Sequence, residues 1–334
     1  LGKLRNMGFV KDERQEQFIF YGLNIRDKAL KNILKNFVDN KDNYEILKNK
    51  PIYVLTYGEL YEMFLMQFKN SSKESVKKNK SILVNYIDFC IGKNIVIHQE
   101  NRLRFLDVSE LVSPHVLLNR YITKKKVREY QNVLYNEQDK LLLGLLHAGI
   151  KGRPTEDGTL EEIINLTIDD VEEETNMLTL TQNNGECRRL KVDSSLIELI
   201  KDTYNQKIYI ENNGEETNNL RLSKPREFQI NQVENYVFRI PGKNKFEKFN
   251  VPLLNSRMQK IQTWVGDPYL TYTNLFKSGM IEMAMDRYKE KGKIDKKDFI
   301  DICERYNYGS GDPEKYWHVV KGWFEQYKEL LEKD

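Results

Sequence analysis

Basic side chains that can bind phosphate gather in two short segments of the sequence. Segment 69–80 holds five lysines and one acidic residue, and segment 120–128 holds five basic residues and no acidic residue. A lysine or arginine that neutralises a phosphate adds affinity for nucleic acid of any sequence. A charge run is also common on a solvated face that binds nothing, but two runs in one chain favour nucleic acid. Their members are Lys69, Lys73, Lys77, Lys78 and Lys80, and Arg120, Lys124, Lys125, Lys126 and Arg128.

The thiol and imidazole side chains do not have the spacing of a metal site. Cys90, Cys187 and Cys303 are scattered along the chain, and the four histidines are isolated from one another. Zinc sites and disulfide frameworks require more, and more regularly spaced, ligands. We therefore expect buried thiols, no bound metal and no cofactor.

The composition indicates a folded chain with more than one core. Of its 334 residues, 40% are hydrophobic and 31% are charged, and the formal net charge is +3. A single core rarely extends much beyond ~250 residues, so two domains are expected. An apolar run of about 18 residues is absent, and segment 1–16 lacks the apolar stretch of a signal peptide. These features predict a cytoplasmic protein without a membrane partner.

The first part of the sequence predicts helices. Segments 25–39 and 57–68 have apolar residues at helical spacing. Ser71 and Glu74 have the form of a capping box for a helix that begins at Ser72. The apolar residues of this helix share one face, and its lysines are expected to face solvent. The apolar positions are Val76, Ile82, Leu83, Tyr86, Ile87 and Cys90.

A change of pattern divides the chain near residues 113–122, where a Ser-Pro break precedes a new periodic segment. We expect a helical domain over 1–117 and a domain over 118–334 that mixes helices with a hairpin. The hairpin strands are predicted at 176–181 and 187–192. Asn184-Gly185 between them suits a tight turn because both residues tolerate positive φ.

The rest of the second domain is predicted to be mostly helical. Ser195 and Glu198 have the spacing of a helix cap before a helix over 196–204. A polar, acidic loop follows at 212–219, and a strand and turn at 236–242. The remaining helices are predicted at 251–264, 274–291, 296–306 and 313–331.

Segment 138–171 carries a motif that identifies a family resemblance. An apolar helix ends at a glycine, and Glu162, Leu166, Asp170 and Val171 then follow at fixed spacing. This pattern resembles the tyrosine recombinases, the phage integrase family, over residues 20–325. The resemblance implies a mainly α fold with a small β component, in which an all-helical, SAM-like core-binding domain that binds DNA precedes a mixed α/β catalytic-like domain.

The family's catalytic groups are largely replaced in this sequence. By resemblance, Tyr316 occupies the position of the nucleophile, as a vestigial one. The first arginine is replaced by Thr159, or displaced to Lys151 or Arg153. Phosphoryl transfer depends on such cations to stabilise the transition state, so the resemblance implies an inactive enzyme. The other substituted positions are Asn183 for the hairpin lysine, Thr273 to Phe276 with Lys277 next for the histidine and second arginine, and Asn307 with Tyr308 for the later histidine or tryptophan.

The resemblance implies that the DNA clamp remains without the catalyst. We expect a sequence-specific transcriptional repressor that maintains prophage lysogeny in a bacterial host, binds operator-like repeats of duplex DNA and is nucleoid-associated. An active but divergent recombinase, or an accessory protein that binds a recombinase, are the alternatives. The expected DNA-binding residues are Lys73, Lys77, Lys78, Lys124, Lys125, Lys126, Arg153, Arg188, Arg189 and Lys277.

The last helix has a broad apolar face that admits two explanations. It packs on its own domain, or, as often occurs in the family that the chain resembles, it docks onto a neighbouring protomer and supports self-association. The face consists of Val319, Val320, Trp323, Phe324, Tyr327 and Leu330.

Overall fold

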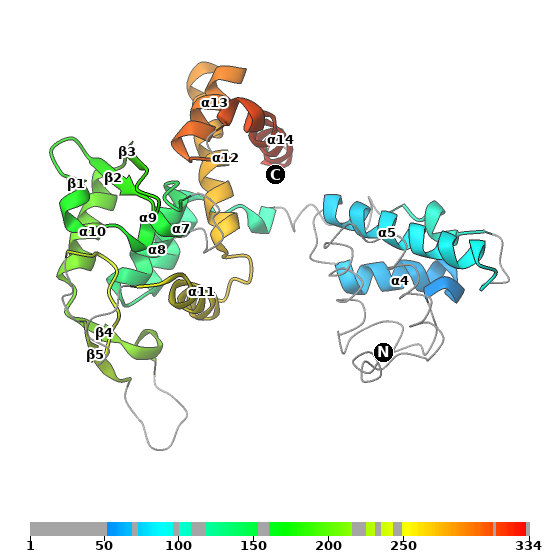
Figure 1. The fold of residues 1–334 in the computed structure, drawn as a ribbon, viewed down its shortest axis with the longest axis horizontal. Coiled ribbons are helices and arrows are strands. Elements are labelled where there is room, and N and C mark those ends of the chain that lie inside the picture. The colour runs from blue at the N-terminus through cyan, green and yellow to red at the C-terminus, as the bar shows by residue number, and fades with distance from the viewer. Residues whose placement is uncertain are drawn as a thin grey trace. The chain divides into compact units, whose positions relative to one another are not determined.

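The chain divides into two compact units, an N-terminal unit Leu1–Leu117 and a C-terminal unit Leu118–Asp334 (Figure 1). The computed structural model describes nine segments of them. These are residues 52–68, 73–95, 100–107, 118–152, 160–215, 225–230, 235–242, 249–309 and 312–331. The helix predicted at 25–39 and the capping box at Ser71 lie outside the described residues.

The described part of the N-terminal unit is a helical pair with short 3-10 turns. Helices α4 (Tyr57–Phe68) and α5 (Lys73–Gly92) accompany η1 (Ile52–Val54) and η2 (Arg102–Phe105). The apolar face predicted for the second helix is confirmed, because all six of its named residues are buried in the core of this unit. Burial of such a stripe is what holds an amphipathic helix in place.

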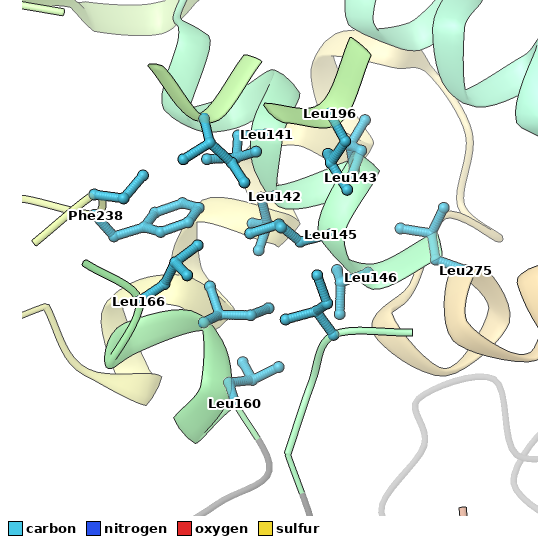
Figure 2. Close-up of a cluster of buried hydrophobic side chains, with 14 of the residues drawn as sticks. Leu141, Leu142, Leu143, Leu145, Leu146, Leu160, Leu166, Leu196, Phe238 and Leu275 are labelled. Atoms are coloured by element: carbon cyan, nitrogen blue, oxygen red, sulfur yellow. The ribbon is translucent and has the colours of Figure 1, made fainter. Parts of the chain in front are cut away.

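The C-terminal unit is built around helix α8 (Glu137–His147). Leu141, Leu142, Leu143, Leu145 and Leu146 are all fully buried, and Figure 2 shows them amid other apolar side chains. A helix that is apolar on every side lies inside a domain. Around it are α7 (Lys124–Val133), α9 (Glu161–Ile164), α10 (Ser194–Asn205) and α11 (Val251–Val265).

Two small antiparallel sheets complete this unit. Strands β1 (Val171–Glu172), β2 (Met177–Thr181) and β3 (Cys187–Lys191) form one sheet, and Thr181 pairs with Cys187. The predicted hairpin is therefore confirmed. A second sheet pairs β4 (Ile208–Ile210) with β5 (Glu227–Gln229), neither of which the sequence indicated. The 3-10 turns η3 (Ile168–Asp170) and η4 (Glu211–Gly214) lie beside them in sequence.

Three local predictions in this unit were wrong. Only Gly185 of the hairpin turn has positive φ, and the backbone of Gln182 already bonds Glu186, so the loop has three residues. Helix α10 begins two residues earlier than expected, with Asp193 as its N-cap. Segment 236–242 forms isolated bridges in place of a strand, Tyr236 with Thr167 and Pro241 with Ile230.

The C-terminal helices form a separate apolar layer. Helices α12 (Tyr272–Lys291), α13 (Lys296–Arg305) and α14 (Pro313–Leu331) pack on one another through a core of their own. Val320, Phe324 and Tyr327 of α14 are buried in this same chain. Packing on its own unit, one of the two explanations of this apolar face, is therefore present, and self-association through α14 stays a prediction.

The observed architecture is mainly helical with a small β component, as predicted. In the described segments, none of the helices is both long and apolar enough to span a membrane.

Candidate functional site

The carboxylate of the motif residue Glu162 is the centre of a buried polar cluster. It has no exposed surface. Its Oε1 accepts a hydrogen bond from Nε of Arg188 at 2.6 Å, and its Oε2 accepts one from Nη2 of Arg188 at 2.7 Å. Oε2 also accepts the backbone N–H groups of Lys151 at 3.0 Å and Gly152 at 2.9 Å. A bidentate arginine pair of this kind fixes orientation as well as charge.

The remaining donors of Arg188 bind backbone carbonyl groups. Nη2 donates to Gly149 at 2.8 Å, and Nη1 donates to the carbonyl of Arg305 at the end of α13. Arg188 thus joins strand β3, the turn after α8 and helix α13. Its predicted role as a DNA ligand does not fit this arrangement, because its charge is neutralised by a buried carboxylate and at least four of its N–H groups are bonded.

The turn after α8 is packed closely against α13. Gly149 has φ +93°, and a Cβ there would lie 2.8 Å from the ring of Tyr306. The hydroxyl of Tyr306 donates to the carbonyl of His147 at 3.0 Å, and its ring meets Phe276 at 5.3 Å. The position where the family has its first arginine therefore follows a turn with little space for larger side chains.

Lys151 is a half-buried cation that directly follows this turn in the sequence. Its Nζ lies 5.2 Å from the ring centroid of Phe276, which itself stands where the resemblance places a second arginine. Burial lowers the pKa of Lys151. Arg153 and Thr159, the other candidates for the first arginine position, lie outside the described residues.

Asn183, at the position of the hairpin lysine, is held by hydrogen bonds to Glu161 and Asn165. Its backbone N–H donates to Glu161 at 3.0 Å, and its side-chain oxygen accepts from Asn165 at 3.1 Å. An amide in this position supplies neither positive charge nor an acidic proton.

Tyr316 packs among aromatic side chains at the start of α14. Its ring lies 6.0 Å from that of Tyr308, which lies 5.4 Å from Trp323. Gly309, with φ +88°, gives it room, since a Cβ there would approach the ring to 2.3 Å. Lys277 lies over Trp323, with its Nζ 4.4 Å from the ring centroid. Lys277 is thus placed on an aromatic surface of its own unit.

Most of the basic segment 120–128 forms the first turns of helix α7, which begins at Lys124. Thr123 caps this helix by accepting from the N–H of Lys126 at 3.2 Å. Lys124 forms an ion pair with Asp193, and Lys126 lies 3.1 Å from Asp267. The cap and these two acidic partners hold the segment in the C-terminal unit.

The exposed cations of the predicted set are distributed over both units. Lys125 is 88% exposed with Glu129 at 4.0 Å, and Arg189 forms an exposed ion pair with Glu172. Lys77 and Lys78 are exposed on α5. The side chain of Lys73 is outside the described set.

Sequence reasoning missed a charged cleft of about 500 Å³ in the C-terminal unit. On its wall Nε2 of His147 lies 3.1 Å from Glu282, which also accepts the backbone N–H of Lys124 at 2.7 Å. Burial raises the pKa of Glu282, but these two contacts outweigh burial and hold the pKa below its usual range. No sequence signal joins His147 and Glu282, because the fold brings them together across 135 residues.

A family model and one curated relative match the chain. Residues 121–323 match the family described as "MrpR, C-terminal catalytic domain". The "SPbeta prophage-derived uncharacterized protein YopR" of Bacillus subtilis (strain 168) is 28% identical over 272 residues, which cover 79% of each chain.

Solved recombinase structures are also similar to the chain. The XerA recombinase is 13% identical, with a TM-score of 0.40 over 94% of this chain and 98% of that one. The Tn1549 transposon integrase in complex with circular intermediate DNA is 11% identical, with a TM-score of 0.44 over 96% and 98%.

Proposed function

Because the chain belongs to the MrpR C-terminal catalytic domain family, we propose that it is a tyrosine-recombinase-like DNA-binding protein that represses transcription and no longer exchanges DNA strands. Its sequence relative is prophage-derived, and we propose the same setting here, in which the protein maintains the lysogeny of an SPβ-type prophage. A clamp that binds duplex DNA through phosphate contacts does not require a catalyst.

The observation that supports the loss of activity is that the charge of Arg188 is neutralised within the protein. This arginine is held by Glu162 and by two backbone carbonyls, so its charge is compensated within the protein. Asn183 and Phe276 occupy two positions where the family has cations. Attack by the phenol of Tyr316 on a phosphodiester needs cations at the pentavalent transition state, and loss of one such stabiliser commonly costs ~10²- to 10³-fold in rate.

The exposed lysines support the DNA-binding part of the proposal. Lys77 and Lys78 on α5 and Lys125 on α7 face solvent, and Lys125 is only weakly paired. Such side chains contribute sequence-independent affinity, while neighbouring side chains read base edges. Repression then needs only occupancy of an operator.

Two measurements test the proposal. Genome-wide mapping of bound sites identifies the operator, and a gel shift with purified protein then measures duplex binding. A nicked version of the same site is incubated with the protein and examined for a denaturant-resistant adduct. We expect binding without an adduct. An adduct that disappears in Tyr316→Phe would contradict the proposed loss of strand exchange. Failure of the pure protein to bind DNA would instead favour an accessory protein that binds a recombinase.

One observation favours an active recombinase as the second candidate. Lys151 is a half-buried cation with a lowered pKa, immediately after the turn that precedes the family's arginine position. A lysine with a lowered pKa is suited to donate a proton to a leaving oxygen. If Lys151 has this role, Lys151→Met abolishes adduct formation while duplex binding persists.

A further inference from the structure

Phe105 is the most exposed of the large hydrophobic side chains in the described residues. It is 65% exposed, and it lies at the end of η2 in the N-terminal unit. A phenyl ring has no polar group to offset its contact with water, so burial of such a side chain is favourable. Single exposed apolar residues are common on protein surfaces, so the surroundings of this ring decide whether it has a role.

The backbone around Phe105 is held firmly by side chains. Nζ of Lys80 donates to the carbonyls of Arg104 at 3.0 Å and Leu106 at 2.6 Å. Leu103 and Leu106 on either side are completely buried. Because its neighbours are fixed in the core, the ring of Phe105 is directed outward by the fold. It is not exposed through local looseness.

Asn101 provides a second clamp on the same turn. This residue is buried, and its side chain caps η2 by accepting the N–H of Leu103 at 3.1 Å. It also donates to the carbonyl of Val84 at 2.8 Å and to Asp88 at 2.9 Å. The turn is thereby tied to α5 at two points, and the aromatic ring is presented without an additional entropic cost of ordering the turn.

The surface next to Phe105 is basic. Phe105 borders an open hollow of about 570 Å³ whose walls include Lys77, Lys80 and Arg104. Arg104 is paired with Asp88, and Asp107 is the acidic residue of the wall. Lys77 is exposed on α5. Positive charge beside an apolar ring complements nucleic acid, whose phosphates surround apolar stacked bases.

We propose that Phe105 is a wedge that inserts between stacked base pairs when the N-terminal unit binds duplex DNA. This inference rests on the proposed DNA-binding function and adds a contact that bends the operator. Apolar wedges of this kind unstack a base step and kink the duplex, most easily at flexible pyrimidine–purine steps. Lys77 and its neighbours contact the flanking phosphates.

The test separates apolar insertion from charge. On a mapped operator duplex, Phe105→Ala is expected to weaken binding roughly 5- to 100-fold, as loss of one aromatic–base stack does. DNA bending, measured by fluorescence resonance energy transfer between the duplex ends, falls with it. The log–log salt slope stays unchanged. Lys77→Ala in contrast reduces the salt slope by about 0.9, and Phe105→Trp retains the bend.

The control is Tyr61→Ala, which truncates another exposed aromatic residue of the same unit. It is expected to change neither affinity nor bend, and the thermal unfolding curves of all variants should coincide with that of the unchanged protein. If the unchanged protein binds no duplex, the proposed function fails. If it binds and Phe105→Ala keeps the full affinity and bend, the wedge is overturned while the repressor proposal stands. The wedge is also overturned if Phe105→Ala keeps its binding to duplex DNA and loses binding only to single-stranded DNA or only to a protein partner.

Discussion

At the scale of single residues, Arg188 and Arg189 show how adjacent basic side chains on one strand acquire different roles. Arg188 points into the C-terminal unit and is 18% exposed beside the fully buried Glu162. Arg189 points to solvent and pairs with Glu172. The sequence places both in a basic pair at a hairpin, but the alternation of a strand sends one side chain inward and the other outward.

This difference predicts unequal costs of substitution. Glu162→Gln leaves the Arg188 guanidinium without its counter-charge, and we expect a loss of about 3–5 kcal/mol in the free energy of unfolding. The double variant Glu162→Gln with Arg188→Met should recover part of that loss. Urea denaturation followed by circular dichroism measures both. Glu172→Gln, which breaks the exposed pair that Arg189 of the same strand makes with β1, is the matched control and should change stability by less than about 1 kcal/mol.

For the buried cluster of Glu162 and Arg188, the sequence predicts which residues belong to the motif but does not predict which groups they bond. The spacing of Glu162, Leu166 and Asp170 identifies the motif because it reflects local geometry. The bonds from Glu162 to the turn 151–152 and to Arg188 depend on how α8, α9 and β3 meet, and chain spacing does not encode that meeting. Lys80 is a second example. The sequence pattern indicated that it faces solvent, but its Nζ donates to the carbonyls of Arg104 and Leu106 at η2, a contact that chain spacing does not encode.

At the scale of elements, helix α7 changes the expectation for the basic segment 120–128. Lys124 and Lys126 already face Asp193 and Asp267, while Lys125 on the next position is almost fully exposed. A counter-ion that is present before DNA binds reduces what a lysine gains from a phosphate. The three lysines are therefore expected to contribute unequally to DNA binding.

The test is the salt dependence of single variants. Lys125→Ala is expected to reduce the log–log salt slope of duplex binding by about 0.9. Lys126→Ala should reduce it less, since Asp267 is released at the same time. Gel shifts over a range of salt concentrations give the slopes. Equal reductions in both variants would mean that DNA displaces Asp267 from Lys126.

Helix α14 illustrates a choice that the sequence left open. Its apolar face suits docking in the same chain or on a second protomer, and amphipathic periodicity is identical in the two cases. In the structure Phe324 meets Phe299 and Tyr288 of its own unit, with ring centroids 5.7 Å apart in each pair. Packing within the unit is the arrangement observed.

Truncating Phe324 should therefore affect folding more than assembly. We expect Phe324→Ala to lower the free energy of unfolding by about 3–5 kcal/mol, through loss of apolar contact and the cavity left behind. Urea denaturation gives the stability, and light scattering after size-exclusion chromatography gives the molecular mass. Leu331→Ala, an exposed position on the same helix, is the control for stability. A variant that keeps its stability but changes its mass would support docking of α14 on a second protomer.

At the scale of the whole molecule, acidic residues hold the helices of the C-terminal unit together. Asp267, in the turn after α11, accepts hydrogen bonds from the hydroxyl of Tyr130 and from Nζ of Lys126 on α7. Glu282 on α12 accepts from the backbone of Lys124 and faces His147 of α8. These contacts join elements that are far apart in sequence, so the stability of the unit depends on the charge of both carboxylates.

The resulting prediction is a loss of stability in acid. Burial raises the pKa of Asp267, but hydrogen bonds from Tyr130 and the backbone of Tyr269, together with Lys126, outweigh burial and hold the pKa below its ordinary value. The folded state therefore binds fewer protons than the unfolded state near the ordinary pKa of about 4. Stability from this group is fully present at neutral pH and is lost as the pH falls through the folded-state pKa.

Urea midpoints measured between neutral pH and about pH 3 give the slope that tests this sign. Asp267→Asn keeps the shape of the side chain but has no proton to gain, so its midpoint should be lower at neutral pH and should fall less steeply in acid. Asp169→Asn, an exposed carboxylate of the same unit, should parallel the unchanged protein. If Asp267→Asn has the same acid slope as the unchanged protein, the pKa of Asp267 is the same in the folded and unfolded states, and the charge of this carboxylate does not stabilise the link between α7 and the end of α11.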